Sequence, residues 1–190
     1  MLFLMIIAAL ALLLLGHSYW PSSTFVHEAF ENIGVILIIV CIVGRTWCSL
    51  YIGGRKKATL VDIGPYSIMR NPLYTFSFLG AFGVGLQFGA MMTGLLAFLA
   101  AYGVFLFIVL REEQFLADKF GAEYNAYLAR VPRFWPKISL WSSPDVIEVY
   151  PGRVWRTFYD ALVFLVSIPL LEFIEQWQDA GIIPVYYYLY

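Results

Sequence analysis

The chain has 190 residues, of which 61% are hydrophobic and 13% are charged, and its formal net charge is −1. Soluble domains are roughly 45–50% apolar and about 25% charged, so this composition excludes an ordinary soluble domain and predicts an integral membrane protein. The sequence has no basic tract and no zinc-type spacing of ligands, so nucleic acid is not expected as a partner, and no metal-ligating residues are predicted. The length fits one domain, and we expect residues 1–190 to form a single membrane domain.

The apolar segments predict an all-α fold with about five membrane-spanning helices. The first covers residues 1–15, the polar and aromatic residues 16–31 are predicted to be a loop, and a second apolar segment begins at Asn32. Residues 71–110 carry no charged side chain. One helix of that length would be about 60 Å long, twice the roughly 30 Å hydrocarbon core of a bilayer. We therefore expect a tight helical hairpin that turns near Gln87.

The C-terminal half contains three further predicted segments. Residues 111–130 place apolar and charged side chains on opposite faces at helical spacing, which predicts an amphipathic helix on the membrane or against the bundle. Residues 131–150 contain three prolines and are predicted to be a loop. A fifth, weaker span begins near Trp155, within a C-terminal extension of residues 151–190.

The distribution of basic residues predicts the topology. In a five-span chain, all twelve Lys and Arg residues fall on the side of the second and fourth loops, or at helix ends that face it. Basic residues accumulate on the cytoplasmic side of membrane proteins. The N-terminus is therefore expected in the cytoplasm and the C-terminus outside.

Arg45 lies ten residues before Arg55, so its guanidinium is expected inside the second span. A charge at that depth is costly unless it is paired or reaches the interface. Arg45 is therefore expected either to extend to the interface beside Trp47 and Tyr51, or to face the helix bundle and bind an anion.

The stretch from Gly64 to Tyr74, GPYSIMRNPLY, is predicted to be a loop that enters a helix. Pro72 favours an extended Asn71 before it and is itself well placed in the first helical turn. The backbone donors at such a helix start attract anions such as a carboxylate. An ordinary loop and an anion site both fit this pattern.

Glu112 and Glu113 close the fourth predicted span. Adjacent carboxylates are unfavourable at the negative end of a helix. Arg111, Arg70 or a bound cation is therefore expected to compensate them, unless the helix end is simply solvated.

As a set, these features resemble the isoprenylcysteine carboxyl methyltransferase and phospholipid methyltransferase superfamily of membrane enzymes. That family combines a GPY-x-x-x-RHPxY stretch with a short helical hairpin and a Glu-Glu pair. The residues that carry the resemblance are Gly64-Pro65-Tyr66, Arg70-Asn71-Pro72-Leu73-Tyr74, Glu112-Glu113, Gly44-Arg45-Thr46-Trp47, Phe120-Gly121-Ala122-Glu123-Tyr124 and Val131-Pro132-Arg133-Phe134-Trp135-Pro136. The resemblance thus covers residues 44–136. Asn71 stands where the family's motif has His, so a role that depends on His is not carried over.

The resemblance implies an S-adenosylmethionine-dependent methyltransferase of a bacterial plasma membrane, with its active site in the cytoplasm. Glu112 and Glu113 are then expected to hold the amino group of the cofactor, and Arg70 or the amides after Pro72 its carboxylate. The implied cofactor-binding residues are Gly64, Tyr66, Arg70, Asn71, Pro72, Tyr74, Glu112, Glu113 and Tyr124.

The implied acceptor is lipophilic and enters from the surrounding membrane lipids. A carboxylate, as in an isoprenylcysteine-like lipid, is favoured because it needs a positive holder rather than a base, and Arg45 and Arg133 are the expected catalytic residues in that role. Methylation of a phospholipid amine and a non-catalytic membrane scaffold that retains the fold stay open as alternatives.

Overall fold

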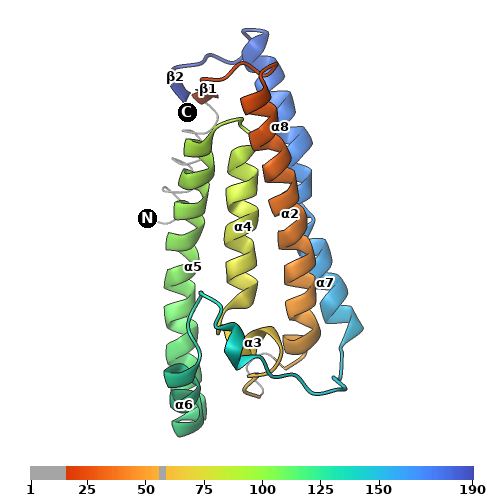
Figure 1. The fold of residues 1–190 in the computed structure, drawn as a ribbon, viewed down its shortest axis with the longest axis vertical. Coiled ribbons are helices and arrows are strands. Elements are labelled where there is room, and N and C mark those ends of the chain that lie inside the picture. The colour runs from red at the N-terminus through yellow and green to blue at the C-terminus, as the bar shows by residue number, and fades with distance from the viewer. Residues whose placement is uncertain (1–15, 56–58) are drawn as a thin grey trace. The chain divides into compact units, whose positions relative to one another are not determined.

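The computed structural model describes residues 16–55 and 59–190, so the predicted first span, residues 1–15, lies outside the described residues. Within those ranges the chain is mostly helical, as predicted (Figure 1). Its elements in chain order are β1 (Gly16–Ser18), α2 (Phe25–Ile52), α3 (Pro65–Ile68), α4 (Pro72–Leu86), α5 (Met91–Phe120), α6 (Ala122–Arg130), the 3-10 helix η1 (Ile138–Leu140), α7 (Pro151–Ala161), α8 (Val163–Asp179) and β2 (Tyr187–Leu189).

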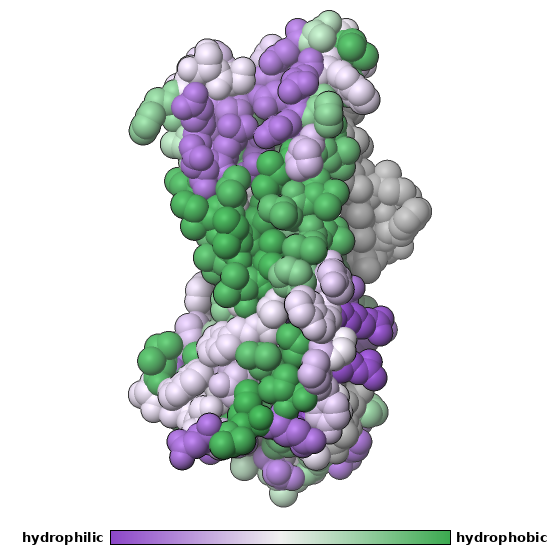
Figure 2. Space-filling view, turned by 90° about the vertical axis from the view of Figure 1, so that its right-hand side faces the viewer, coloured by the Kyte–Doolittle hydropathy of each residue, from purple (hydrophilic) through white to green (hydrophobic). Residues whose placement is uncertain are grey.

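Three helical segments of the described chain are long and apolar enough to cross a membrane: Phe25–Ile52, Met91–Phe120 and Pro151–Asp179. Helix α4 is apolar but has only 15 residues, or about 22 Å at 1.5 Å per residue, which is shorter than the hydrocarbon core. Large apolar side chains such as Val166 and Leu170 are exposed. Figure 2 shows hydrophobic residues in a continuous green region of the face that it draws. The chain is thus a membrane protein by length and composition, and the five-span count stays a prediction.

The described chain divides into two compact units. Unit 1 takes in the chain up to Ile42, Phe78–Val104 and Leu162–Tyr190, and unit 2 takes in Val43–Ser77 and Phe105–Ala161. Helices α2, α4 and α5 each contribute residues to both units. The single domain expected from the chain length stays a prediction.

The turn between α4 and α5, in unit 1, falls at residues 87–90, where the length limit on an uncharged helix predicts it. Gly89 has a φ of +64°, a conformation that glycine adopts without strain. A Cβ added to Gly83 would lie 2.6 Å from the carbonyl oxygen of Gly34 on α2. The glycines of this segment therefore allow helix backbones to approach closely.

The start of α2 corrects the predicted loop over residues 16–31, because the helix begins at Phe25. Thr24 caps it: the N–H of His27 points to the Thr24 hydroxyl oxygen at 3.5 Å. Before it, β1 pairs in parallel with β2. His27 and Glu31 consequently lie one turn apart on a helix instead of in a loop.

The boundaries of the predicted amphipathic helix over residues 111–130 are also wrong. Helix α5 continues to Phe120, and α6 begins after Gly121, which has a φ of +54°. Glu, Lys, Leu and Ala all favour helix, so a change from apolar to charged residues does not end one. Tyr124 and Tyr127 of α6 are buried within the protein, and an association of α6 with the membrane surface stays a prediction.

In unit 2 the loop before α4 pairs with the segment after α6. The N–H of Arg70 donates to the carbonyl of Pro132 at 2.9 Å, and the N–H of Asn71 donates to the carbonyl of Arg133 at 3.2 Å. These backbone hydrogen bonds hold two stretches that are distant in sequence side by side.

Candidate active site

Glu113, on α5, is the centre of an ion-pair cluster in unit 2. Its carboxylate lies 3.2 Å from Nη1 of Arg70. Arg133 donates to it from both Nε and Nη2, at distances down to 2.8 Å, which is the forked geometry that arginine favours with a carboxylate. The side chains of Glu113 and Arg70 are 11% and 13% exposed. Two positive charges thus converge on one largely buried carboxylate.

Glu112 points to a different partner from its neighbour, because successive residues of a helix project about 100° apart. The hydroxyl of Tyr74, on α4, donates to Oε2 of Glu112 at 3.1 Å. The ring of Tyr74 packs against Phe105 of α5, with 5.1 Å between the ring centroids. The two adjacent glutamates are therefore stabilised in different ways, one by cations and one by a phenol.

Asn71 directly precedes α4, where Pro72 predicts it, and its polar groups are used inside the protein. Its N–H and its side-chain amide both point to the carbonyl of Arg133, at 3.2 and 3.4 Å. Its own carbonyl accepts the N–H of Thr75. Asn71 consequently ties the start of α4 to the segment that carries Arg133.

A pocket with about 640 Å³ of space free of protein atoms, its open mouth included, adjoins these side chains. Seven of the nine predicted cofactor-binding residues line it: Tyr66, Arg70, Asn71, Tyr74, Glu112, Glu113 and Tyr124. Gly64, Pro72 and the two predicted catalytic arginines, Arg45 and Arg133, are not among the residues that line it.

Two buried polar atoms of pocket-lining residues make no hydrogen bond within the described residues: the hydroxyl oxygen of Tyr66 and Nε of Arg70. Tyr66 is 4% exposed. Buried polar atoms are nearly always partnered in folded proteins. These two atoms therefore fit a polar ligand in the pocket.

The aromatic wall of the pocket consists of uncharged phenols. Burial, assisted by the charge of Glu113, raises the pKa of Tyr124 to about 12. Tyr127, which the sequence analysis did not assign to the site, donates from its hydroxyl to the carbonyl of Tyr66 at 2.8 Å. The spacing of Tyr124 and Tyr127 predicts that both lie on one face of α6. This spacing alone does not show whether either ring lines a pocket.

Gly64 shapes the site without lining the pocket. Its φ is +58°, and a Cβ at this position would lie 2.3 Å from the ring of Tyr51. Only glycine fits this close approach at such a φ.

Arg45 is held by α4. Its Nη1 donates to the hydroxyl of Ser77, and its buried Nε makes no hydrogen bond within the described residues. Ser77 in turn donates to the carbonyl of Leu73 at 2.8 Å. This neutral contact supplies no counter-charge for the guanidinium.

Comparison with known proteins defines the class. The family described as phospholipid methyltransferase matches residues 6–123, which is more than half of the chain. The chain therefore belongs to the phospholipid methyltransferase family of membrane methyltransferases, and the predicted resemblance is confirmed.

Two relatives are similar over nearly the whole chain. The cobalt-zinc-cadmium resistance protein CzcN of Cupriavidus metallidurans is 35% identical over 92% of this chain and 80% of its own length. The nickel-cobalt-cadmium resistance protein NccN of Alcaligenes xylosoxydans is 34% identical over 92% of this chain and 81% of its own length. No solved structure matches the chain.

Proposed function

We propose that this protein transfers a methyl group from S-adenosylmethionine to a lipophilic acceptor at the unit 2 pocket. The observation that carries the proposal is the pair of opposite charges on the pocket wall, Glu112 and Arg70, beside the unpartnered Tyr66 hydroxyl. The amino-acid end of the cofactor carries one ammonium and one carboxylate, so it complements such a pair. The family supports the same reaction.

Glu112 is the residue we assign to the ammonium group. Its carboxylate belongs to a residue that lines the pocket and accepts a hydrogen bond from Tyr74, and an ionised carboxylate can accept several hydrogen bonds at once. Glu113 instead holds Arg70 and Arg133. We therefore assign Glu113 a positioning role: it fixes the guanidinium of Arg70, whose Nε is available to the carboxylate of the cofactor.

The tyrosine rings of the pocket can attract the positively charged sulfonium group of the cofactor. Tyr66, Tyr124 and Tyr127 line the pocket, and the face of an aromatic ring attracts a cation within about 6 Å. When bound, the cofactor supplies a methyl group on a positively charged sulfur. The rings and the ion-pair cluster would orient that group toward the acceptor, and such orientation contributes much of the rate of a displacement reaction.

Neither of the two predicted arginines lines the cofactor pocket, and of the two Arg45 is the better candidate to hold the acceptor next to it. Arg133 directs both Nε and Nη2 to Glu113, whereas the Nε of Arg45 makes no hydrogen bond within the described residues. A lipid carboxylate would compensate its charge. This assignment favours ester formation over methylation of an amine, which would need a proton acceptor as well.

Cofactor binding is tested by calorimetry of the full chain in detergent with S-adenosylhomocysteine, the product, which permits no turnover. We expect saturable binding that Glu112→Gln weakens by roughly 10- to 100-fold, since a charge-assisted hydrogen bond contributes about 1.5–3 kcal/mol. Asp118→Asn, an exposed acidic residue on the same helix, is the matched control and should bind normally. Absence of binding by the unmodified chain would support the scaffold alternative instead.

The acceptor is identified by incubating membranes with cofactor labelled in its methyl group and separating the labelled products. A carboxyl methyl ester releases labelled methanol in mild base, whereas an N-methyl group does not. Label that stays in the lipid after base treatment would overturn the ester assignment and favour the phospholipid amine.

We further propose that this activity contributes to tolerance of divalent transition metals. The support is the pair of relatives named as cobalt-zinc-cadmium and nickel-cobalt-cadmium resistance proteins, each similar over 92% of this chain. A strain that lacks the gene should grow less well on these metals, and the unmodified gene should restore growth. Failure of Glu112→Gln to restore growth would link tolerance to the pocket, whereas full restoration would separate the two.

A further inference from the structure

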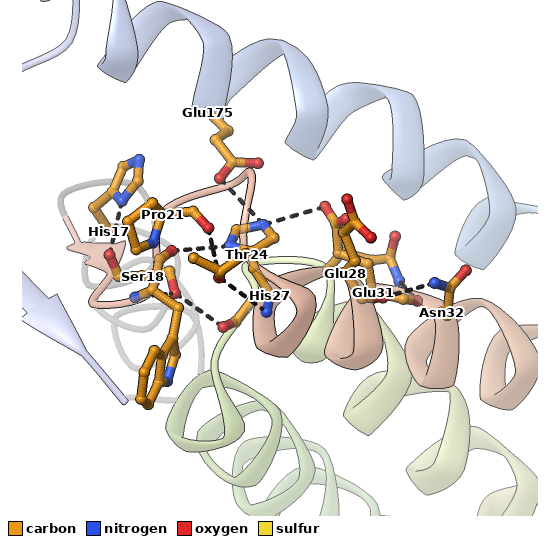
Figure 3. Close-up of polar contacts among 12 residues, drawn as sticks. His17, Ser18, Pro21, Thr24, His27, Glu28, Glu31, Asn32 and Glu175 are labelled. Atoms are coloured by element: carbon orange, nitrogen blue, oxygen red, sulfur yellow. Dashed lines mark hydrogen bonds and ion pairs between the residues drawn. The ribbon is translucent and has the colours of Figure 1, made fainter.

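A second cluster of chemistry-bearing side chains lies in unit 1, apart from the cofactor pocket residues. His27 and Glu31 lie one turn apart on α2, and Glu175 reaches them from α8 (Figure 3). Nε2 of His27 lies 3.4 Å from Oε1 of Glu31 and 3.3 Å from Oε1 of Glu175. One atom from each residue can be chosen so that all three lie within 4.8 Å of one another. No metal ligands are predicted from the sequence, in which Glu175 lies far from His27 and Glu31.

The tautomer of His27 directs its lone pair into this cluster. Nδ1 lies 3.1 Å from the carbonyl oxygen of Trp20, and a carbonyl can only accept, so Nδ1 carries a proton. In the neutral ring, Nε2 then presents a lone pair toward two carboxylates. The side chain is 1% exposed, and Nε2 makes no hydrogen bond in the part of the chain that the structure describes. A lone pair that faces two anions is unfavourable, and a positive charge between them, either a proton on Nε2 or a metal ion, removes the repulsion.

The charge balance of unit 1 points the same way. Its sequence ranges contain five carboxylates, on Glu28, Glu31, Glu172, Glu175 and Asp179, and no Lys or Arg. The side chains of Glu31 and Glu175 are only 30% and 17% exposed. Partly buried carboxylates need a counter-charge, and no basic side chain other than histidine is present in this unit to supply it.

The distances suit a small metal ion. Zinc binds histidine nitrogen and carboxylate oxygen at about 2.0–2.2 Å in tetrahedral sites, which places neighbouring ligand atoms about 3.4 Å apart. The two distances from Nε2, 3.4 and 3.3 Å, are of this size. One histidine and two carboxylates leave a fourth position for water.

The surroundings fix the ligands in place. The hydrogen bond from Nδ1 to Trp20 is the outer contact that orients most metal-binding histidines. The side-chain amide of Gln87 donates to the backbone carbonyl of Glu31 at 2.9 Å. Gly89 lies so close to the imidazole that a Cβ there would be 2.1 Å from Nδ1. The ring is therefore held from two sides.

We propose that His27, Glu31 and Glu175 bind one divalent transition-metal cation, of the class of zinc or cobalt(II). Nε2 of His27 and one oxygen of each carboxylate are the ligands, and water completes the coordination. Its three residues belong to unit 1, whereas the residues that line the cofactor pocket belong to unit 2.

The test is metal binding by the full chain, purified in detergent and stripped with a chelator. Titration with zinc chloride should show one strong site, and cobalt(II) chloride should give the visible absorption of a tetrahedral complex. Glu175→Gln and His27→Asn should each weaken binding by roughly 100-fold or more, because loss of even an outer contact costs about 10- to 100-fold. The Asn side chain can still donate to the carbonyl of Trp20, which helps the variant to fold.

His17→Asn is the matched control. His17 also faces a carboxylate, with Nε2 3.2 Å from Oδ1 of Asp179, but Asp179 is its one acidic partner among the ion pairs of the described residues. This variant and Glu112→Gln should bind zinc like the unmodified chain. Absence of strong binding by the unmodified chain would overturn the proposal in favour of a proton shared by the cluster, as would unchanged binding by folded Glu175→Gln.

Discussion

Arg133 donates two hydrogen bonds to the carboxylate of Glu113, from Nε at 3.1 Å and from Nη2 at 2.8 Å. Glu113 also contacts Arg70, so one carboxylate joins α5 to the loop before α4 and to the segment after α6. Of the two adjacent glutamates that line the pocket, Glu113 therefore has a structural role in joining these three segments.

Glu113→Gln should therefore destabilise the protein, because it leaves two guanidinium groups around a neutral amide. We expect a loss of about 1–3 kcal/mol in the free energy of unfolding, measured by denaturant titration in detergent. Asp118→Asn, exposed on the same helix, should change it by less than about 0.5 kcal/mol. Equal stability of the two variants would remove the positioning role of Glu113.

Tyr74→Phe should weaken binding of S-adenosylhomocysteine by about tenfold while the protein stays folded. The change removes the hydroxyl that orients Glu112 and keeps the ring that packs on Phe105, and one hydrogen bond to a charged group contributes roughly 1.5 kcal/mol or more. Calorimetry measures the affinity. Tyr159→Phe, at a 62% exposed residue of α7, is the control, and an equal effect of both changes would contradict the assignment of Glu112.

Gly64→Ala should destabilise unit 2 by about 2–4 kcal/mol, because the new Cβ meets the ring of Tyr51 and the positive φ is unfavourable for alanine. Gly152→Ala is the matched change in α7, where nothing lies within 4 Å of the added atom. That control should be neutral or stabilising by about 0.5–1 kcal/mol. Thermal unfolding of both variants measures the difference.

Gly89→Ala should abolish strong zinc binding, because its Cβ would displace the imidazole of His27. Gly181→Ala separates this effect from backbone strain: Gly181 has a similar φ, +72° against +64°, but open space around it. We expect zinc affinity to fall only for the first variant. If both variants lost zinc binding, the cause would be backbone strain at a glycine of positive φ and not displacement of the His27 ring.

The protein should lose stability as the pH rises from about 10 to 12. The pKa of Tyr124 is raised to about 12 in the folded protein, against about 10 in an unfolded chain. In that interval the folded state keeps a proton that the unfolded state releases, so rising pH favours unfolding by up to about 1.4 kcal/mol per pH unit for this group. Tyr124→Phe should flatten the slope of unfolding free energy against pH, and an unchanged slope would contradict the burial of this phenol.

Features with a local physical cause could be predicted from the sequence. The limit on the length of an uncharged span locates the α4–α5 turn near Gln87, and the fixed φ of Pro72 locates the start of α4 after Asn71. In both cases a few neighbouring residues decide the conformation.

The rest depends on partners distant in the chain. The charge of Glu113 suggests a cation, but only the fold selects Arg133 alongside Arg70. His27 and Glu31 are four residues apart, but residues 16–31 are predicted to be a loop, in which this spacing does not place two side chains together. Glu175 lies on another helix, so its proximity depends on the fold. The sequence predicts that the fourth span ends near Leu110, whereas α5 continues to Phe120. The first charged residues mark the edge of the hydrocarbon core of the membrane, and a helix can continue beyond that edge.

The loop before α4 is completed by residues made much later in synthesis. The backbone partners of Arg70 and Asn71 are Pro132 and Arg133, whereas the family match ends at residue 123. A nascent chain that has reached residue 123 already carries Glu113, but the second arginine of its cluster, Arg133, has not yet been synthesised. The ion-pair cluster can therefore be completed only after Arg133 has been made, and chimaeras between family members should be joined beyond Arg133 and not at the end of the matched region.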